Sequence, residues 1–393
     1  NPGGDLDLLE GLAGLVDKNL IRQEGDEEPR FAMLETIREY AADTLQDRGE
    51  AEMILGAHAS YFVGLADEAR ASFEEAVSPS WLDRLAREYT NMRAALSWLL
   101  TQSKGDRDLL LLVGGLWRFW WIRGQVHEGR AWLDAILART ADSISAERAI
   151  ALRAASHLAM EQKELEQAKA LADAAVELAR QVGDKAALGD VLMTQGLSAQ
   201  VRGDLELARR SYEESLALAR ELGRTQRIGI ILRELGQVAR EQGDMVQATE
   251  LLQQSAALHQ KLNDVRSLMR DYLALAELAE EQHDPEQAEA LFCRSLALGR
   301  HVQEMGTIAH LLDALARLAA WRAEHSRAAH LLAAADGLRK TFDITLSLEE
   351  HKLREACIAH VRSELGETWE PAWQTGRPMS LEEAVAYALE EGP

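Results

Sequence analysis

The chain has 393 residues, of which 47% are hydrophobic, so it is long enough to bury a large core. Its formal net charge of -22 at pH 7 repels nucleic-acid phosphates and anionic membrane surfaces, which argues against direct binding to either. The two cysteines, Cys293 and Cys357, predict neither a disulfide framework nor a zinc site, and a cytoplasmic location is expected. No apolar run approaches the roughly 18 to 20 residues that a membrane span needs.

Residues 1–50 change their hydrophobic period midway. The leucines between positions 8 and 15 have helical spacing, whereas the short runs 20–23 and 30–34 alternate on either side of a turn-rich segment. A helix followed by a β-hairpin forms the second half of a winged helix. Because this segment has five basic and thirteen acidic side chains, we do not expect it to bind DNA. The first residue is asparagine rather than methionine, so we expect the chain to begin inside a longer protein.

Residues 51–105 are expected to form a helical linker. Its apolar residues between Trp81 and Leu99 recur in steps of four and three, which predicts one amphipathic helix. The next segment is rich in tryptophan, with Trp117, Trp120 and Trp121 close together. Aromatic residues at helical spacing usually belong to a core, although the most exposed of them could also contact another domain.

Four alanines stand forty residues apart, at positions 168, 208, 248 and 288. In the clearest copy Ala208 is followed four residues later by the bulky Tyr212 and then three residues later by Ser215. Steps of four and three place these side chains on one helical face, where a small residue lets a neighbouring helix approach closely. We therefore expect the alanines to be intolerant of large side chains.

The turns follow the same period. Gly203 and Gly243 open Gly-Asp turns between two helices, and Gly183, Gly223 and Asn263 stand where a left-handed residue commonly ends a helix. Each unit is therefore predicted to be a helical hairpin. Weaker units before and after the clear ones extend the predicted array over residues 106–345, as expected for the atypical end units of a repeat protein.

A folded helical cap is expected over residues 346–393. Ser380 with Glu383, and Ser347 with Glu350, have the spacing of capping boxes, which begin helices.

The small, bulky, small pattern after a Gly-Asp turn resembles the tetratricopeptide repeat, although the units here are longer than the common length of about 34 residues. The expected fold is all-α: a right-handed tetratricopeptide-type superhelix of antiparallel hairpins with repeats of about 40 residues, preceded by a partial winged helix with a short β-hairpin.

The flanking segments resemble a second, larger class. LVDKNLIRQ and RFAMLETIREYA, and later EYTNMRAALSWL and LWRFWWIRGQVHEGRAWL, are similar to segments of bacterial signal-transducing ATPases of the STAND class. The resemblance implies a sensing, autoinhibitory arm that contacts a nucleotide-binding domain of the same protein. The arm would respond to a protein or peptide partner or to a small anionic inducer. The alternative is a constitutive scaffold that holds partner proteins without switching.

No catalytic or metal-binding motif stands out. The chain has no phosphate-binding glycine loop ending in Gly-Lys-Ser or Gly-Lys-Thr, so the ATPase itself is not expected here. The histidines lack the i, i+4 spacing of a helical ligand pair, and no nucleophile, base and orienting residue form a recognisable set. We predict no enzyme activity, metal or cofactor. A hydrolase with His351 or His360 as its base is a further alternative.

The first helix of each hairpin is expected to line a concave groove, with Trp121 and Trp321 in equivalent places in the outer units. The residues predicted to face this groove are Arg153, His157, Met193, Gln200, Arg233, Gln237, Arg240, Arg270, Glu277 and Glu280. Arginine suits a carboxylate or phosphate, so the groove is predicted to bind an acidic peptide, a partner's acidic segment or an anionic metabolite. The alternative is that these arginines pair with neighbouring acidic side chains. Charge reversal at Arg233 and Arg240 is expected to abolish binding without changing the helical content.

Overall fold

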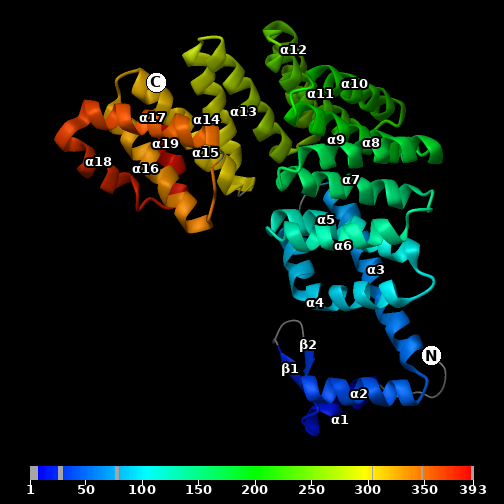
Figure 1. Ribbon diagram of the computed structural model, residues 1–393. Coiled ribbons are helices and arrows are strands. Elements are labelled where there is room, and N and C mark those ends of the chain that lie inside the picture. The colour runs from blue at the N-terminus through cyan, green and yellow to red at the C-terminus, as the bar shows by residue number, and fades with distance from the viewer. Residues whose placement is uncertain (1–7, 25–29, 76–78, 303, 347, 391–393) are drawn as a thin grey trace. The chain divides into compact units, whose positions relative to one another are not determined.

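The computed structural model describes residues 8–24, 30–75, 79–302, 304–346 and 348–390. It forms two compact units, Asn1–Ser143 and Ile144–Pro393 (Figure 1). Helices make up most of both units, which confirms the predicted all-α class. Among the described residues, strands occur only in one two-stranded sheet.

The first unit begins with a helix and a β-hairpin, as predicted. Helix α1 (Leu8–Asp17) is followed by the antiparallel strands β1 (Ile21–Glu24) and β2 (Arg30–Met33) and by helix α2 (Glu35–Asp47). Ile21 lies opposite Met33, and Glu24 lies opposite Arg30. The predicted turn between the strands lies at residues 25–29, outside the described part of the chain.

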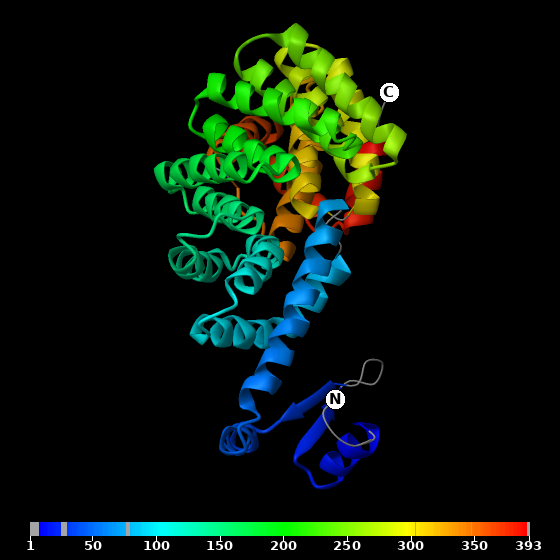
Figure 2. The same cartoon turned by 90° about the vertical axis from the view of Figure 1, so that its right-hand side faces the viewer.

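Four helices complete the first unit: α3 (Ala51–Glu75), α4 (Pro79–Thr101), α5 (Asp106–Ile122) and α6 (Val126–Arg139). Helix α3 is the long blue helix in Figure 2. Helix α5 packs closely on α3, since a Cβ atom at Gly115 would lie only 2.2 Å from the carbonyl oxygen of Ala66. This packing places the α5–α6 hairpin in the first unit, whereas the sequence placed it at the start of the repeat array. Trp117 and Trp120 are buried in this unit, as expected of core aromatics.

The second unit contains five successive helical hairpins, each made of a first helix and a second helix (Figure 1). The first helices are α7 (Ala146–Glu161), α9 (Lys185–Val201), α11 (Thr225–Glu241), α13 (Val265–Glu281) and α15 (Met305–Trp321). The second helices are α8 (Leu165–Val182), α10 (Leu205–Glu221), α12 (Met245–Leu262), α14 (Pro285–Val302) and α16 (His325–Phe342). This succession confirms the predicted solenoid of forty-residue hairpins.

The turn between the two helices of a hairpin has the same backbone conformation in all five hairpins. Gly203 and Gly243 are left-handed, with φ angles of 79° and 83°. At the equivalent positions Lys163, His283 and Ala323 adopt φ angles of 61° to 62°, although side chains disfavour this region. The repeat geometry therefore imposes the left-handed turn even where glycine is absent.

The four alanines spaced forty residues apart lie on the second helices of the first four hairpins, where the two helices of a hairpin meet. All four are completely buried, as predicted. The serine seven residues after Ala208, Ala248 and Ala288 has a role that the spacing did not reveal. The hydroxyl oxygens of Ser215, Ser255 and Ser295 each lie 2.8 Å from a carbonyl oxygen 26 residues earlier, on the first helix of the same hairpin. The serine thus satisfies a polar group where the two helices meet.

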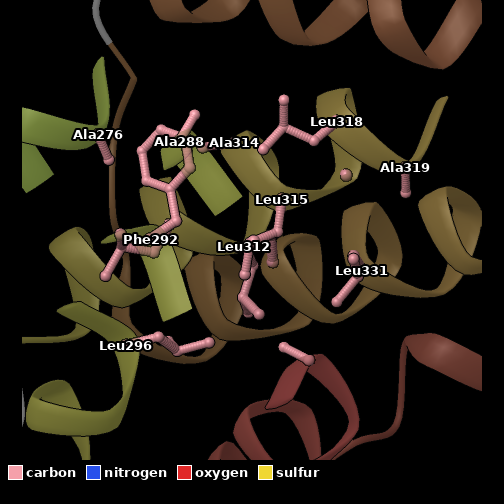
Figure 3. Close-up of a cluster of buried hydrophobic side chains, with 14 of the residues drawn as sticks. Ala276, Ala288, Phe292, Leu296, Leu312, Ala314, Leu315, Leu318, Ala319 and Leu331 are labelled. Carbon is pink, nitrogen blue, oxygen red and sulfur yellow. The ribbon is translucent and has the colours of Figure 1, made fainter. Parts of the chain in front are cut away.

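Side chains from successive hairpins share one core in the C-terminal half of this unit. Phe292 of α14 belongs to the same buried cluster as Leu312 and Leu315 of α15 and Leu331 of α16 (Figure 3). Because neighbouring hairpins bury each other's apolar faces, the array gains stability mainly from contacts between adjacent units.

Helices α17 (Leu348–Leu365), α18 (Trp369–Gly376) and α19 (Leu381–Glu390), with the short 3-10 helix η1 (Gly366–Thr368), follow the last hairpin. The capping box at Ser380 is confirmed: its backbone N–H donates to Glu383 Oε2 at 2.8 Å, and the Glu383 N–H donates to Ser380 Oγ at 3.3 Å. The other predicted capping box involves Ser347, which lies outside the described residues. These helices pack on α14 and α16 as part of the same unit.

Candidate functional site: a groove on four helices

A cavity of about 500 Å³ lies along the first helices of the last hairpins and the helix that follows them. We call it the four-helix groove. Helices α11 and α13 contribute Arg240, Glu277, Glu280 and Glu281, helix α15 contributes His310, Asp313 and Arg317, and helix α17 contributes Glu350, Leu353 and Arg354. Nearly all of these side chains are ionisable, so electrostatics determines what the groove can bind.

A series of charged side-chain contacts connects the helices across the groove. Arg240 Nη1 of α11 donates to Glu277 Oε2 of α13 at 2.8 Å. The other carboxylate oxygen of Glu277 lies 3.2 Å from His310 Nε2 of α15, and His310 Nδ1 lies 3.3 Å from Glu350 Oε1 of α17. The four helices α11, α13, α15 and α17 are thus joined by four side chains. A second pair, Arg317 with Glu280, links α15 to α13 at 3.0 Å.

These contacts change the protonation of the groove. Burial by itself would raise the pKa of Glu277, but hydrogen bonds from His310 and Arg240 outweigh it and lower the pKa. The hydrogen bond to Glu277 raises the pKa of His310 despite its burial and the nearby Arg317, and Glu350 adds to the rise. A neutral imidazole can donate from only one nitrogen, whereas an imidazolium can donate to both carboxylates.

Protonated His310 is therefore expected to stabilise the second unit. Since its pKa in the folded protein is above the ordinary value of 6.5, this contribution is fully present below pH 6.5 and is lost as the pH rises through the raised pKa. Urea unfolding between pH 5.5 and 8.5 (roughly one unit on the acid side and two on the alkaline side of the ordinary value) measures it. The His310→Gln variant should lose this part of the pH dependence.

The matched control for this prediction is His351→Gln, which removes an exposed histidine of α17. It should retain the pH dependence of the parent protein. An unchanged pH dependence in His310→Gln would show that the contacts with Glu277 and Glu350 do not stabilise the imidazolium.

The structure brings only part of the predicted groove set together. Arg240, Glu277 and Glu280 line the four-helix groove. Gln237 is half-buried one helical turn before Arg240. Arg270 instead pairs with Glu304, at 2.8 Å, near the opposite end of α13.

The predicted residues of the earlier hairpins lie outside the four-helix groove. Gln200 Nε2 donates to Glu241 Oε1 at 2.6 Å, and His157 Nε2 lies 3.0 Å from the hydroxyl of Thr194. Met193 packs against the core around Tyr212. Arg153 is buried, with only 8% of its surface exposed.

Arg233 is a packing residue rather than an exposed groove residue. Only 8% of its surface is accessible, and its guanidinium lies 3.1 Å from Glu234 Oε1 and 3.5 Å from Asp271 Oδ1. Asp271 is completely buried. Charge reversal at Arg233 would place its new carboxylate beside Asp271 in the core, so we now expect this substitution to destabilise the fold rather than to leave the helical content unchanged.

Arginines of the predicted set are paired with carboxylates, as the alternative interpretation held. Arg233 and Arg240 each contact an acidic side chain on their own helix or on the next first helix, and Arg270 contacts Glu304, the N-cap residue of α15. A free cluster of guanidinium groups that would attract a small anion is therefore not present at these three positions.

Sequence reasoning missed much of the groove, although the forty-residue period contained the signal. The residue forty positions after Arg270 is His310, and the residue forty positions after His310 is Glu350. The residue forty positions after Glu277 is Arg317. The predicted groove residues ended at Glu280 of α13, with Trp321 of α15 as the one position named beyond it.

Ser255, His259 and Asp271 form a buried polar cluster that resembles a catalytic set only in composition. His259 Nδ1 lies 2.6 Å from Asp271 Oδ2, and the Ser255 hydroxyl lies 2.8 Å from Asp271 Oδ1. Asp271 and Ser255 both approach the Nδ1 side of the His259 ring, whereas a nucleophile and an orienting carboxylate must use opposite ring nitrogens. All three side chains are also inaccessible to a substrate. The cluster is structural.

His351 and His360, the candidate bases of the hydrolase alternative, are both exposed residues of α17. His360 is exposed, with its ring edge-on to that of His325 at a centroid distance of 5.6 Å, which fits a surface histidine better than a general base. Within the described ranges, no group of three or more His, Cys, Asp and Glu side chains could hold a metal ion. In the same part of the chain, no helix has both the length and the apolar character needed to cross a membrane.

The stacked hairpins and the groove on their first helices define a tetratricopeptide-type repeat protein. Residues 147–368, more than half of the chain, match the model of the MalT-like TPR region. The chain belongs to this family.

Relatives and solved structures extend the comparison. HTH-type transcriptional regulators of Mycobacterium bovis and Mycobacterium tuberculosis are 31% identical over 210 residues, which is 50% of this chain but only 23% of theirs. A STAND protein with a tetratricopeptide repeat sensor from Pyrococcus horikoshii aligns with 96% of this chain and 60% of its own, with a TM-score of 0.54 and 13% identity. A Rap protein complexed with Competence and Sporulation Factor aligns with 86% of this chain and 99% of its own, with a TM-score of 0.53 and 12% identity. These two structural similarities concern the fold alone.

Proposed function

We propose that this chain is the partner-sensing arm of a STAND-type signal-transducing regulator, and that it binds a peptide or protein segment in the four-helix groove. The observation that carries the proposal is that side chains from four helices, α11, α13, α15 and α17, line one cavity. An occupant would contact all four helices at once, and can therefore change their arrangement. Family membership, the named regulators and the fold of the STAND sensor protein support the same assignment.

A peptide suits the groove better than a small anionic inducer. Arg240 and Arg317 already hold the carboxylates of Glu277 and Glu280 at 2.8 and 3.0 Å, so an anion would have to displace a bound carboxylate. A peptide offers backbone donors and acceptors as well as side chains, and can follow the groove without breaking these pairs. The Rap structure, whose title describes a complex with Competence and Sporulation Factor, is consistent with a groove of this fold serving a signalling ligand.

The contacts across the groove suggest how binding becomes a signal. The series of side-chain contacts from Arg240 through Glu277 and His310 to Glu350 fixes neighbouring helices relative to each other. A ligand shifts the arm between two states only if it binds the two states with different free energies. A ligand that replaces one of these contacts would bind the state with the contact and the state without it with different free energies. In the proposed regulator, the unoccupied arm holds the nucleotide-binding domain closed, and occupancy releases it.

A blocked groove tests the proposal. Peptides are selected from a random library on the purified chain, and their affinities are measured by fluorescence anisotropy. Leu353 lines the groove and is 57% exposed, so Leu353→Trp should fill the groove without disturbing the core. We expect it to weaken peptide binding at least about tenfold, which corresponds to about 1.4 kcal/mol. Val246→Trp, at an exposed position of α12, is the matched control and should bind as the parent does.

Equal binding by Leu353→Trp and the parent chain would contradict the groove assignment. Binding that is lost in Arg240→Glu and competed by inorganic phosphate would instead identify an anion site. Hydrogen exchange separates a sensor from a constitutive scaffold. A sensor should show altered exchange in α11, α13, α15 and α17 beyond the contacted residues, whereas a scaffold should show protection at the contacts only.

A further inference from the structure

Trp321 is an exposed tryptophan beside the four-helix groove. It ends α15, and 71% of its surface is accessible, whereas Trp117, Trp120 and Trp369 are all buried. An indole ring in water leaves a large apolar area uncovered, and such rings commonly serve as contact points for partners.

A second cavity, of about 310 Å³, lies against this indole. Its apolar lining comes from Trp321, Leu318 and Pro285. Glu280 and Arg317 line both this cavity and the four-helix groove, so the two adjoin, and the ion pair between Glu280 and Arg317 lies where they meet. One extended ligand can therefore occupy both.

The four-helix groove presents negative charge to an occupant. Five carboxylates line it, against three guanidinium groups and His310. Two of the carboxylates are more accessible than the guanidinium groups: the side chains of Glu281 and Glu350 are 45% and 39% exposed, whereas that of Arg240 is 23% exposed. Glu281 lies 3.6 Å from Arg240 Nε, a long contact that leaves its carboxylate capacity to accept hydrogen bonds.

We infer that the ligand of this site is a peptide segment with two features: an apolar side chain that packs on Trp321, and a lysine or arginine that contacts Glu281 and Glu350. The inference rests on the proposed function and names the class of its ligand. The inference depends on the two adjoining cavities. One has an apolar wall formed by Trp321, Leu318 and Pro285, next to His283, and the other is lined by more carboxylates than guanidinium groups. It also reverses the charge preference expected from the sequence, since Arg240 and Arg317 are already paired with Glu277 and Glu280.

Synthetic peptides of defined composition test this inference. The probes are fluorescein-labelled Gly-Ser peptides that carry one leucine or phenylalanine and one charged residue, lysine, arginine, glutamate or aspartate, at varied spacing. We expect the best basic probes to bind at least about tenfold more tightly than their acidic counterparts, and binding to weaken as salt is added. Tighter binding of the acidic probes would overturn the inference.

Two variants examine the contacts separately. Trp321→Ala should weaken the apolar–basic probes about tenfold or more, while a probe that lacks the apolar residue should be unaffected. Glu281→Gln should reduce the preference for basic over acidic probes. The controls are Val246→Ala and Glu166→Gln, which alter exposed positions on α12 and α8. Thermal unfolding of each variant verifies that the fold is retained.

The two proposals fail in different ways. If no peptide binding is sensitive to Leu353→Trp, the proposed function itself is wrong. If binding is blocked by Leu353→Trp but is indifferent to Trp321→Ala and to the sign of the probe's charge, the groove assignment holds and the ligand class is wrong.

Discussion

Replacing Asp271 with alanine is expected to lower the free energy of unfolding by about 3 to 5 kcal/mol, because it removes one partner of a buried ion pair. Asp271 is completely buried and lies 3.5 Å from the guanidinium of Arg233, which is itself almost inaccessible. Its carboxylate also contacts the Ser255 hydroxyl and the His259 ring at 2.8 and 2.6 Å. The substitution would remove the carboxylate from the His259 ring and would leave Arg233 with Glu234 as its acidic partner, whereas the Ser255 hydroxyl keeps the Gly229 carbonyl as an acceptor. Urea unfolding followed by circular dichroism measures the loss.

A double variant shows whether the loss comes from the uncompensated charge. Arg233→Leu combined with Asp271→Leu removes both charges, and should be less destabilised than the sum of the two single variants. Asp173→Ala, which removes a half-exposed carboxylate paired with Lys169, is the control and should cost no more than about 1 kcal/mol. Strictly additive effects of the two leucine substitutions would contradict the coupling between Arg233 and Asp271.

Asp313→Ala is expected to cost a similar amount, about 3 to 5 kcal/mol, but to act on a different part of the second unit. Asp313 of α15 lies 2.5 Å from Arg339 Nη2 of α16 and 3.5 Å from Arg354 Nε of α17, and all three side chains are buried. Without the carboxylate, two guanidinium groups remain in the core, with Asp336 only 3.7 Å from Arg354 as a remaining partner. Helix α17 should therefore loosen first.

Hydrogen exchange by mass spectrometry detects this local effect. In Asp313→Ala the amides of α17 should exchange faster, while those of α7 to α10 should be unchanged, because a repeat array transmits stability mainly between neighbours. Glu355→Ala is the matched control: it removes an exposed carboxylate 3.8 Å from the same Arg354, and should change stability by no more than about 0.5 kcal/mol. Uniform acceleration across the unit, or unchanged exchange in α17, would contradict the role of Asp313 as its anchor.

This anchor also matters for the groove. Helix α17 supplies Glu350 and Leu353 to the groove wall, and Arg354 joins it to Asp313. The buried ion cluster thus positions the exposed residues that are proposed to meet a ligand.

The repeat pattern predicted packing positions well. Ala208 and Ala248 are completely buried where two helices meet, and Gly203 and Gly243 adopt the left-handed turn. These outcomes follow from local rules. A helix places residues three and four apart on one face, and a tight turn between helices needs a particular backbone conformation. Neither depends on how far one hairpin is rotated relative to the next.

Predictions of accessibility were less successful. Arg233 and Arg240 are seven residues apart on one face of α11, yet Arg233 is buried against Asp271, whereas Arg240 lies in the groove beside Glu277. Helical spacing assigns both to the same face, but it does not say how deeply the neighbouring helix α13 covers each one.

The sequence by itself determined the forty-residue hairpin, its turns and its buried small residues, because these depend on periodicity within a single unit. Only the tertiary structure decided which charges are neutralised and which remain accessible. The partners Arg240 and Glu277 are 37 residues apart in the chain, and Glu277 and His310 are 33 apart, so each contact joins two hairpins. Whether two such side chains meet depends on the packing between neighbouring helices, and this packing is set by the shared core rather than by the charged residues themselves.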